Sequence, residues 1–147
     1  MNKFLLLIIL CFGILISASC SSTEEPTSSN TITGIVWQWE RVIVQPDSVT
    51  TTVPNPENYT IVFNEDGTLT GQADCNSYGG TYSQESGFVI TLGPATMAYC
   101  GEDSLDQQYL DLLSQVVAGG PDGAGGLALE NAGGQTRMEF SNGGTAS

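Results

Sequence analysis

The side chains of this chain that could do chemistry are thiols and carboxylates. The 147-residue sequence has no histidine, and Lys3 is its single lysine. Ser-His-Asp and Cys-His catalytic arrangements are therefore excluded, and so are metal sites built on histidine. A lysine Schiff base is excluded as well in any product that has lost Lys3.

Paired carboxylates remain as candidates for acid/base catalysis. Glu65 and Asp66 adjoin at a predicted turn, while Glu102, Asp103 and Asp106 crowd the start of a predicted helix. The helix dipole favours negative charge at such a start without any catalytic role. Weak calcium binding by these oxygens is an alternative, although the sequence has no twelve-residue calcium loop. We therefore expect a protein that is not an enzyme, with no catalytic residue, no cofactor and no metal.

Residues 1–19 have the pattern of an export signal. Lys3 gives a positive start, and a run of 13 largely apolar residues follows at 4–16. This run is too short for a transmembrane helix, which needs about 20 residues. The small residues 17–19 then precede Cys20, as in the lipobox of bacterial lipoproteins, and this resemblance implies cleavage before Cys20 and its lipidation. The alternative is an ordinary signal peptide cut near Ala18.

Residues 20–31 predict a flexible tether, because residues 21–30 include no apolar side chain that could order them by burial. Several acyl chains on Cys20 would anchor the protein stably. Ser21, rather than aspartate, after this cysteine resembles lipoproteins sorted to the outer membrane. We expect a lipid-anchored protein of the cell envelope, in the outer membrane, with its periplasmic or surface face left open.

The acidity of the chain limits its partners. Without the leader, two arginines stand against 16 acidic residues, a formal charge of −14. Nucleic acid is excluded as a partner, because phosphate binding requires clustered Lys and Arg. Anionic lipid headgroups would also repel the folded domain. We interpret the charge chiefly as a source of solubility, and we expect a monomer that contacts a protein partner in the envelope.

Cys75 and Cys100 are the thiols that remain once the leader is removed and Cys20 is lipidated. An even pair in an oxidising compartment favours a disulfide. Closing the 26-residue segment between them would stabilise the domain by about 3 kcal/mol. Two nucleophiles or a metal site are the alternatives, and the metal site needs more soft ligands than two cysteines supply.

The element that must position these groups is a hairpin over residues 59–82. Residues 59–63 alternate in strand fashion, and Asp66-Gly67 supplies turn chemistry before a second strand at 68–70. Residues 71–80, which carry Cys75, are expected to form a loop into a third strand.

The rest of the chain predicts short strands and one helix. Ser104 and Gln107 form a capping-box pattern at the helix start, and apolar residues recur at helical spacing. The glycine-rich residues 119–126 lack the Gly-Lys-Ser/Thr ending of a phosphate loop. The other predicted elements are a strand at 32–44, a proline-containing loop or edge excursion at 45–58, strands at 81–83 and 88–92, a helix at 104–117, a closing hairpin of 127–130 with 136–140, and a loose tail at 142–147. We expect a mainly β fold, a small antiparallel β-barrel or curled sheet of about eight strands with one covering α-helix.

Residues 32–140 resemble the META/HslJ domain family. The resemblance rests on a central phenylalanine, glycine, Cys-Asn and aromatic pattern, on a Thr-to-Met-Ala-Cys segment, on a helix pattern and on a first-strand tryptophan. The residues that carry it are Phe63, Gly67, Gly71, Cys75, Asn76, Tyr78, Gly80, Tyr82, Thr96, Met97, Ala98, Tyr99, Cys100, Asp106, Tyr109, Leu110, Leu113 and Trp37. Asp74 stands where the family usually has glycine. The resemblance implies a META-like domain over 32–147, β-rich and often lipid-anchored, in a family linked to stress and antibiotic tolerance, and it carries no catalytic residue set.

Three functions follow as hypotheses. The first is a non-enzymatic envelope domain for protein interaction, with Trp37, Trp39 and Tyr99 as contact residues if they are exposed and as core residues otherwise. The second is a tethered inhibitor that blocks a basic secreted hydrolase through its acidic loops. The third is a small barrel that binds an apolar ligand.

Overall fold

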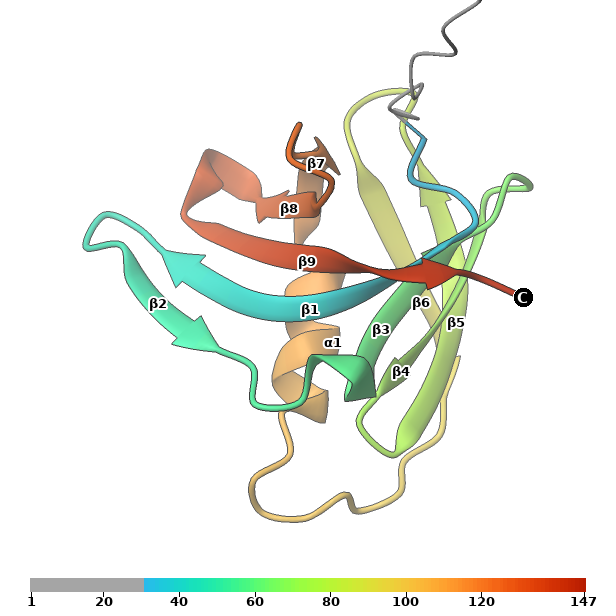
Figure 1. The fold of residues 1–147 in the computed structure, drawn as a ribbon, viewed down its shortest axis with the longest axis vertical. Helices are drawn as coiled ribbons and strands as arrows, with labels where there is room; N and C mark the ends of the chain where they lie inside the picture. Colours follow the sequence, from blue (N-terminus) through green and yellow to red (C-terminus); the bar gives the residue numbers. More distant parts are fainter. Residues whose placement is uncertain (1–30) are drawn as a thin grey trace, which may run out of the picture.

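The computed structural model describes residues 31–147 (Figure 1). The predicted signal peptide, most of the predicted tether and Cys20 lie outside these residues. The described chain forms one antiparallel sheet with strand order β6-β5-β4-β3-β1-β9-β8-β7, and β2 pairs with β1 beside this path. The elements are β1 (Ile35–Val44), β2 (Val49–Thr52), η1 (Pro56–Asn58), β3 (Tyr59–Phe63), β4 (Thr68–Ala73), β5 (Asn76–Ser83), β6 (Val89–Ala95), α1 (Asp106–Ser114), β7 (Val116–Pro121), β8 (Leu127–Asn131), η2 (Ala132–Gly134) and β9 (Thr136–Thr145).

The sheet curls into a half-barrel around α1. In Figure 1, β1 and β9 cross in front of the helix, with β3–β6 on one side and β7 and β8 on the other. The two ends of the sheet approach each other where the Phe88 amide, just before β6, donates a 2.9 Å hydrogen bond to the Val117 carbonyl of β7. The predicted class, a curled antiparallel sheet with one covering helix, is confirmed. None of the described helices is long and apolar enough to cross a membrane.

The β3–β4 hairpin forms as predicted. Tyr59, Ile61 and Phe63 point into the core, and Phe63 pairs with Leu69 across the hairpin. Gly67 adopts a φ of 82°, which favours glycine. Asp66 Oδ1 accepts hydrogen bonds from the Thr68 hydroxyl and amide, and these bonds lower the pKa of Asp66.

Helix α1 fills the concave side of the sheet with Tyr109 and Leu113, which are fully buried. The Tyr109 ring stacks on Trp39 of β1, with centroids 5.2 Å apart. Its hydroxyl lies 3.2 Å from that of Tyr78, which donates to the Thr60 carbonyl. Burial raises the pKa of both phenols well above the ordinary value.

Of two predictions about loops, one was wrong. Residues 71–80 are not a loop: β4 and β5 pair through Ala73 and Asn76, which leaves Asp74 and Cys75 as a two-residue turn. Asp74 adopts a φ of 57°, the left-handed region that favours the glycine usual there. Residues 45–58 contain β2 and η1, so the edge-excursion alternative describes them better than a plain loop.

The predicted helix was too long. It begins at Asp106 and ends at Ser114, and residues 116–121 form β7 instead, paired with β8. The capping box is not formed: the Ser104 hydroxyl accepts a 3.3 Å bond from the Asp106 amide, and Leu105 is the cap residue. The tail also differs, because β9 continues to Thr145 and pairs with Ile35.

Candidate functional site

The candidate site is the loop of residues 96–105, called here the distal loop, which joins β6 to α1. It is tied at its middle to the β4–β5 turn by the disulfide between Cys75 and Cys100. The two Cα atoms are 5.6 Å apart, within the usual range for a disulfide. The predicted pairing of these cysteines is present in the structure. Because both sulfurs are bonded to each other, neither is a free thiol that could bind a metal or act as a nucleophile.

Asn76 fastens the distal loop from inside. This side chain, the first of β5, is only 1% exposed. Its amide nitrogen donates to the Ala98 carbonyl at 3.0 Å and to Asp106 Oδ2 of α1 at 3.0 Å. Its oxygen accepts from the Ala98 amide at 2.7 Å and from the Thr96 hydroxyl at 3.1 Å. One side chain therefore holds both backbone groups of Ala98 and links the distal loop to the helix start.

Sequence reasoning assigned no role to Asn76. The signal available was its position directly after Cys75 in the family pattern. Its side chain satisfies the backbone carbonyl and amide of Ala98 directly. Because a buried amide with unpaired groups is costly, its complete pairing indicates a structural task.

The outer side of the distal loop presents two large side chains to solvent. Met97 is 75% exposed and Tyr99 is 81% exposed. Both flank Ala98, whose backbone Asn76 holds. Tyr99 is thus the one predicted contact residue that is exposed, and Met97 was missed because a lone methionine carries no sequence signal for exposure.

Trp37 and Trp39 are core residues, with exposures of 3% and 1%. The indole of Trp37 donates to the Ile32 carbonyl at 2.9 Å, and that of Trp39 donates to the Arg41 carbonyl at 3.0 Å. Their bonds and burial correct the hypothesis that they are surface contacts. They follow the alternative weighed for them, core packing.

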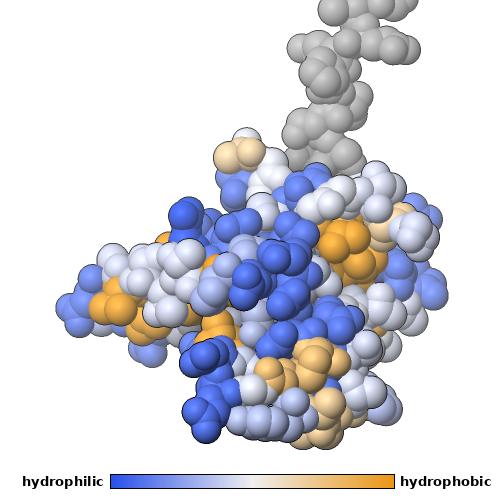
Figure 2. Space-filling model, turned by 60° about the horizontal axis from the view of Figure 1, so that its bottom comes forward, coloured by the Kyte–Doolittle hydropathy of each residue, from blue (hydrophilic) through white to orange (hydrophobic). Residues whose placement is uncertain are grey.

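The surface beside the distal loop is acidic. An open depression there is lined by Asp74, Glu102, Asp103 and uncharged residues that include Pro54 and Leu105. A second depression on the loop runs from Met97 to Glu102 and reaches Asp106. Figure 2 turns this end of the molecule toward the viewer and shows a mostly hydrophilic face with separate small apolar areas. The distal loop thus combines two exposed large side chains, Met97 and Tyr99, with carboxylates nearby.

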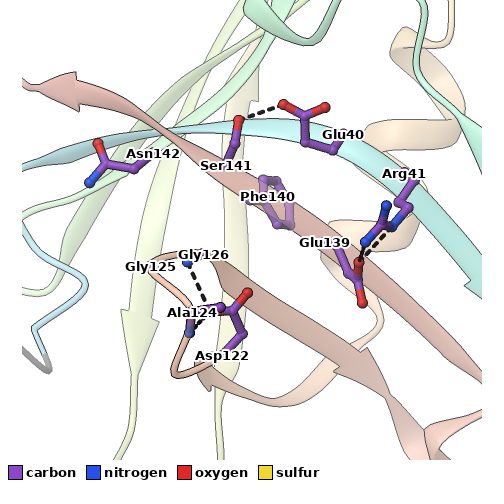
Figure 3. Close-up of a pocket in the computed structure, with 10 residues that line it drawn as sticks. All are labelled: Glu40, Arg41, Asp122, Ala124, Gly125, Gly126, Glu139, Phe140, Ser141 and Asn142. Carbon is purple, nitrogen blue, oxygen red and sulfur yellow. Dashed lines mark hydrogen bonds and ion pairs between the residues drawn. The ribbon is translucent and has the colours of Figure 1, made fainter.

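A different depression, between β1, β9 and the turn after β7, has polar groups that satisfy each other (Figure 3). Arg41 Nε donates to Glu139 at 2.6 Å, and the Ser141 hydroxyl donates to Glu40 at 2.5 Å. Asp122 accepts from the Ala124 and Gly126 amides, and these bonds lower its pKa. These hydrogen bonds and the ion pair join β1 to β9 and hold the turn after β7 in its conformation.

Glu139 is the centre of the ion pairs of β9. Besides Arg41 it accepts a 3.0 Å bond from Arg137, which also pairs with Glu130 at 2.6 Å. Burial would raise the pKa of Glu139, but the hydrogen bonds and charges of the two arginines outweigh burial and lower it. Within residues 31–147, no group of three or more carboxylate or thiol side chains is placed to hold a metal ion.

Comparison with known proteins supports the family and the fold. The family model described as META domain matches residues 30–143. A crystal structure of a DUF4847 family protein from Bacteroides vulgatus ATCC 8482 is similar at 14% identity, with a TM-score of 0.57, over 75% of this chain and 93% of that chain. An NMR structure of a protein from Burkholderia xenovorans is similar at 20% identity, with a TM-score of 0.60, over 76% and 83%. No curated protein matches significantly. At these identities the solved structures establish the fold alone.

Proposed function

The chain belongs to the META domain family, and from that premise we propose that it is a non-enzymatic interaction domain, anchored in the cell envelope through Cys20, that contacts a partner protein with its distal loop. The observation that carries the proposal is the 81% exposure of Tyr99 on a loop whose inner side is fixed. Exposed aromatic side chains on an ordered surface are typical of protein contacts.

The chemistry of the described surface supports contact over catalysis. The sequence has no histidine, and the two thiols of the folded domain are joined to each other. The carboxylates near the distal loop are exposed or half-buried, whereas acid/base catalysis requires a positioned group with a substrate site. An envelope role under stress, which the family resemblance implies, fits such a domain.

The anchor is tested separately from the loop. Cys20→Ala should move the protein from the washed membrane fraction to the soluble fraction, since no thioether can form. Cys11→Ala, inside the apolar run of the leader, is the matched control and should stay in the membrane. Retention of the Cys20→Ala variant would contradict lipidation, and separation of inner and outer membranes would test the expected outer-membrane address.

The contact is tested by photo-crosslinking in intact cells. A photoreactive residue at position 99 should give a covalent adduct with a protein partner. The same residue at position 50, exposed on β2, is the control and should give much less. Equal labelling at the two positions would contradict a contact at the distal loop.

A second candidate is a tethered inhibitor of a basic secreted hydrolase, favoured by the acidic side chains around the distal loop. Excess purified domain should then slow such an enzyme in a salt-sensitive way, and an unchanged rate would remove the candidate. The apolar-ligand hypothesis has less support, because Trp39, Tyr59 and Tyr109 pack against one another in the interior.

A further inference from the structure

We propose that the distal loop is a preorganised plug: Met97 and Tyr99 enter an apolar cleft of the partner protein, and the rim of that cleft carries Lys and Arg side chains that face Asp74, Glu102 and Asp103. This inference rests on the proposed function, and it adds the chemistry of the partner and the direction from which it binds.

The distal loop exposes two large apolar side chains to solvent. Met97 and Tyr99 are the most exposed large apolar residues of the described chain. Leaving them in water has no benefit for folding, since neither packs on the core. Tyrosine supplies a large contact area with few rotatable bonds, and methionine adapts to irregular pockets. Side chains of these kinds are suited to fill a cleft.

The backbone between them is fixed before any partner binds. Asn76 holds the carbonyl and the amide of Ala98, and the disulfide holds Cys100 directly after Tyr99. The Cys75 amide also donates to Cys100 Sγ at 3.3 Å. Association is weakened by the entropy lost when a mobile loop is ordered. A loop ordered in advance avoids much of that loss.

The negative charge around the distal loop predicts the charge of the residues at the rim of the partner's cleft. The depression that Met97 and Tyr99 line also contains Glu102 and Asp106. The neighbouring depression, which shares Glu102 and Cys100 with it, adds Asp74 and Asp103. The two arginines of residues 31–147 lie elsewhere: Arg41 is held in an ion pair with Glu139, and Arg137 in ion pairs with Glu130 and Glu139. A cationic rim would therefore complement this surface, whereas a second copy of the chain or an anionic membrane would be repelled.

The distal loop also lies far from the start of the described chain. In Figure 1 the described chain begins at the top and the distal loop lies at the bottom. The described chain therefore begins at the end of the domain opposite the distal loop. A protein anchored through Cys20, which precedes that end in the sequence, would present the loop away from the bilayer, and this favours a protein partner over a lipid surface.

The test uses the partner captured by the photoreactive residue at position 99, identified and purified. Its affinity for the intact soluble domain is measured by calorimetry between about 50 mM and about 500 mM salt. We expect the affinity to fall with salt, Tyr99→Ala to weaken binding at least about tenfold, and Glu102→Gln with Asp103→Asn to weaken it about threefold or more and to flatten the salt dependence. Asp47→Asn, an exposed carboxylate between β1 and β2, is the matched control and should leave the affinity unchanged.

The outcomes separate the two proposals. Salt-independent binding that also survives the double charge substitution would overturn the cationic rim while the contact at position 99 stands. Full binding by Tyr99→Ala would overturn the plug. A lipid adduct at position 99, or labelling no stronger than at position 50, would overturn the proposed function itself. Circular dichroism of each variant ensures that a loss of affinity does not come from unfolding.

Discussion

At the scale of single residues, the geometry of the distal loop depends on Asn76, a buried side chain that does not itself reach the surface. Asn76 makes hydrogen bonds to the loop, to the disulfide sulfur of Cys100 and to α1. Met97 and Tyr99, the exposed residues, owe their placement to it. The residue that positions the loop is thus buried, while the residues proposed to make the contact are exposed.

Asn76→Ala should lower the free energy of unfolding by about 2–3 kcal/mol, because it leaves buried donors and acceptors of the loop without partners. Ser77→Ala is the matched control: Ser77 is exposed on the same strand, and its loss should cost less than about 0.5 kcal/mol. Urea unfolding of both variants measures the difference. Similar values for the two would show that Asn76 does not hold the loop.

The ion pairs of Glu139 predict how the free energy of unfolding depends on pH. Its folded-state pKa is lowered, so its contribution to stability is present above the unfolded pKa and is lost as pH falls through the folded value. Glu139→Gln should therefore destabilise by about 1 kcal/mol at pH 7, and the deficit should shrink as the pH falls below the ordinary glutamate pKa of about 4.5 and through the lowered folded-state value. Urea unfolding over this pH range tests it, with Asp47→Asn as the control. A deficit that grows on acidification would contradict the assigned role.

At the scale of elements, alternation and turn chemistry were enough to predict some strands. β3 and the start of β4 follow from alternating burial around Asp66 and Gly67, and the β8–β9 hairpin follows from apolar runs on either side of a polar turn. Only the end of β5, residues 81–83, was predicted; its first part could not be predicted in the same way, because its adjacent glycines have low strand propensity. It exists because it pairs on both sides, with β4 and with β6.

Tertiary pairing also decided the end of the helix. Val116 and Val117 fit the helical spacing and the β-branched preference of strands equally well, and pairing with β8 selects the strand. Gly119 fits the strand closely, since a Cβ there would lie 2.7 Å from the Ala128 carbonyl oxygen. For the site, residue type was enough to predict the disulfide and named Tyr99 as a contact only if exposed, whereas the exposure of Tyr99 and Met97 and the burial of both tryptophans depend on the fold.

Gly71 in β4 shows how closely the hairpins pack. A Cβ there would lie 2.2 Å from the Thr60 carbonyl oxygen and 2.4 Å from the Tyr78 hydroxyl, which crosses over this glycine. Gly71→Ala should cost about 2–3 kcal/mol through overpacking. Gly79→Ala is the matched control, because its Cβ would meet only the Leu69 carbonyl oxygen, at 3.5 Å. It should cost less than about 1 kcal/mol, and equal losses in thermal unfolding would contradict this account.

At the scale of the whole molecule, the sheet and the disulfide have separate tasks. The half-barrel is held by the aromatic packing of Trp39, Tyr59 and Tyr109 around the helix. The disulfide lies outside that cluster, at the end of the domain that carries the distal loop. The fold should therefore survive loss of the disulfide, while the domain loses stability and the loop loses part of its fixation.

The double variant Cys75→Ala with Cys100→Ala should keep the far-UV circular dichroism spectrum of the native sheet. Its free energy of unfolding should fall by about 3 kcal/mol, because the unfolded chain is no longer constrained by the 26-residue closed segment. Dithiothreitol should lower the stability of the native protein by a similar amount and leave that of the double variant unchanged, so the reductant separates the disulfide from other effects of the substitutions. Equal stability of the native protein with and without reductant, once reduction is verified by thiol titration, would contradict the stabilising effect assigned to the bond. Loss of the sheet spectrum in the double variant would show instead that the half-barrel depends on the disulfide.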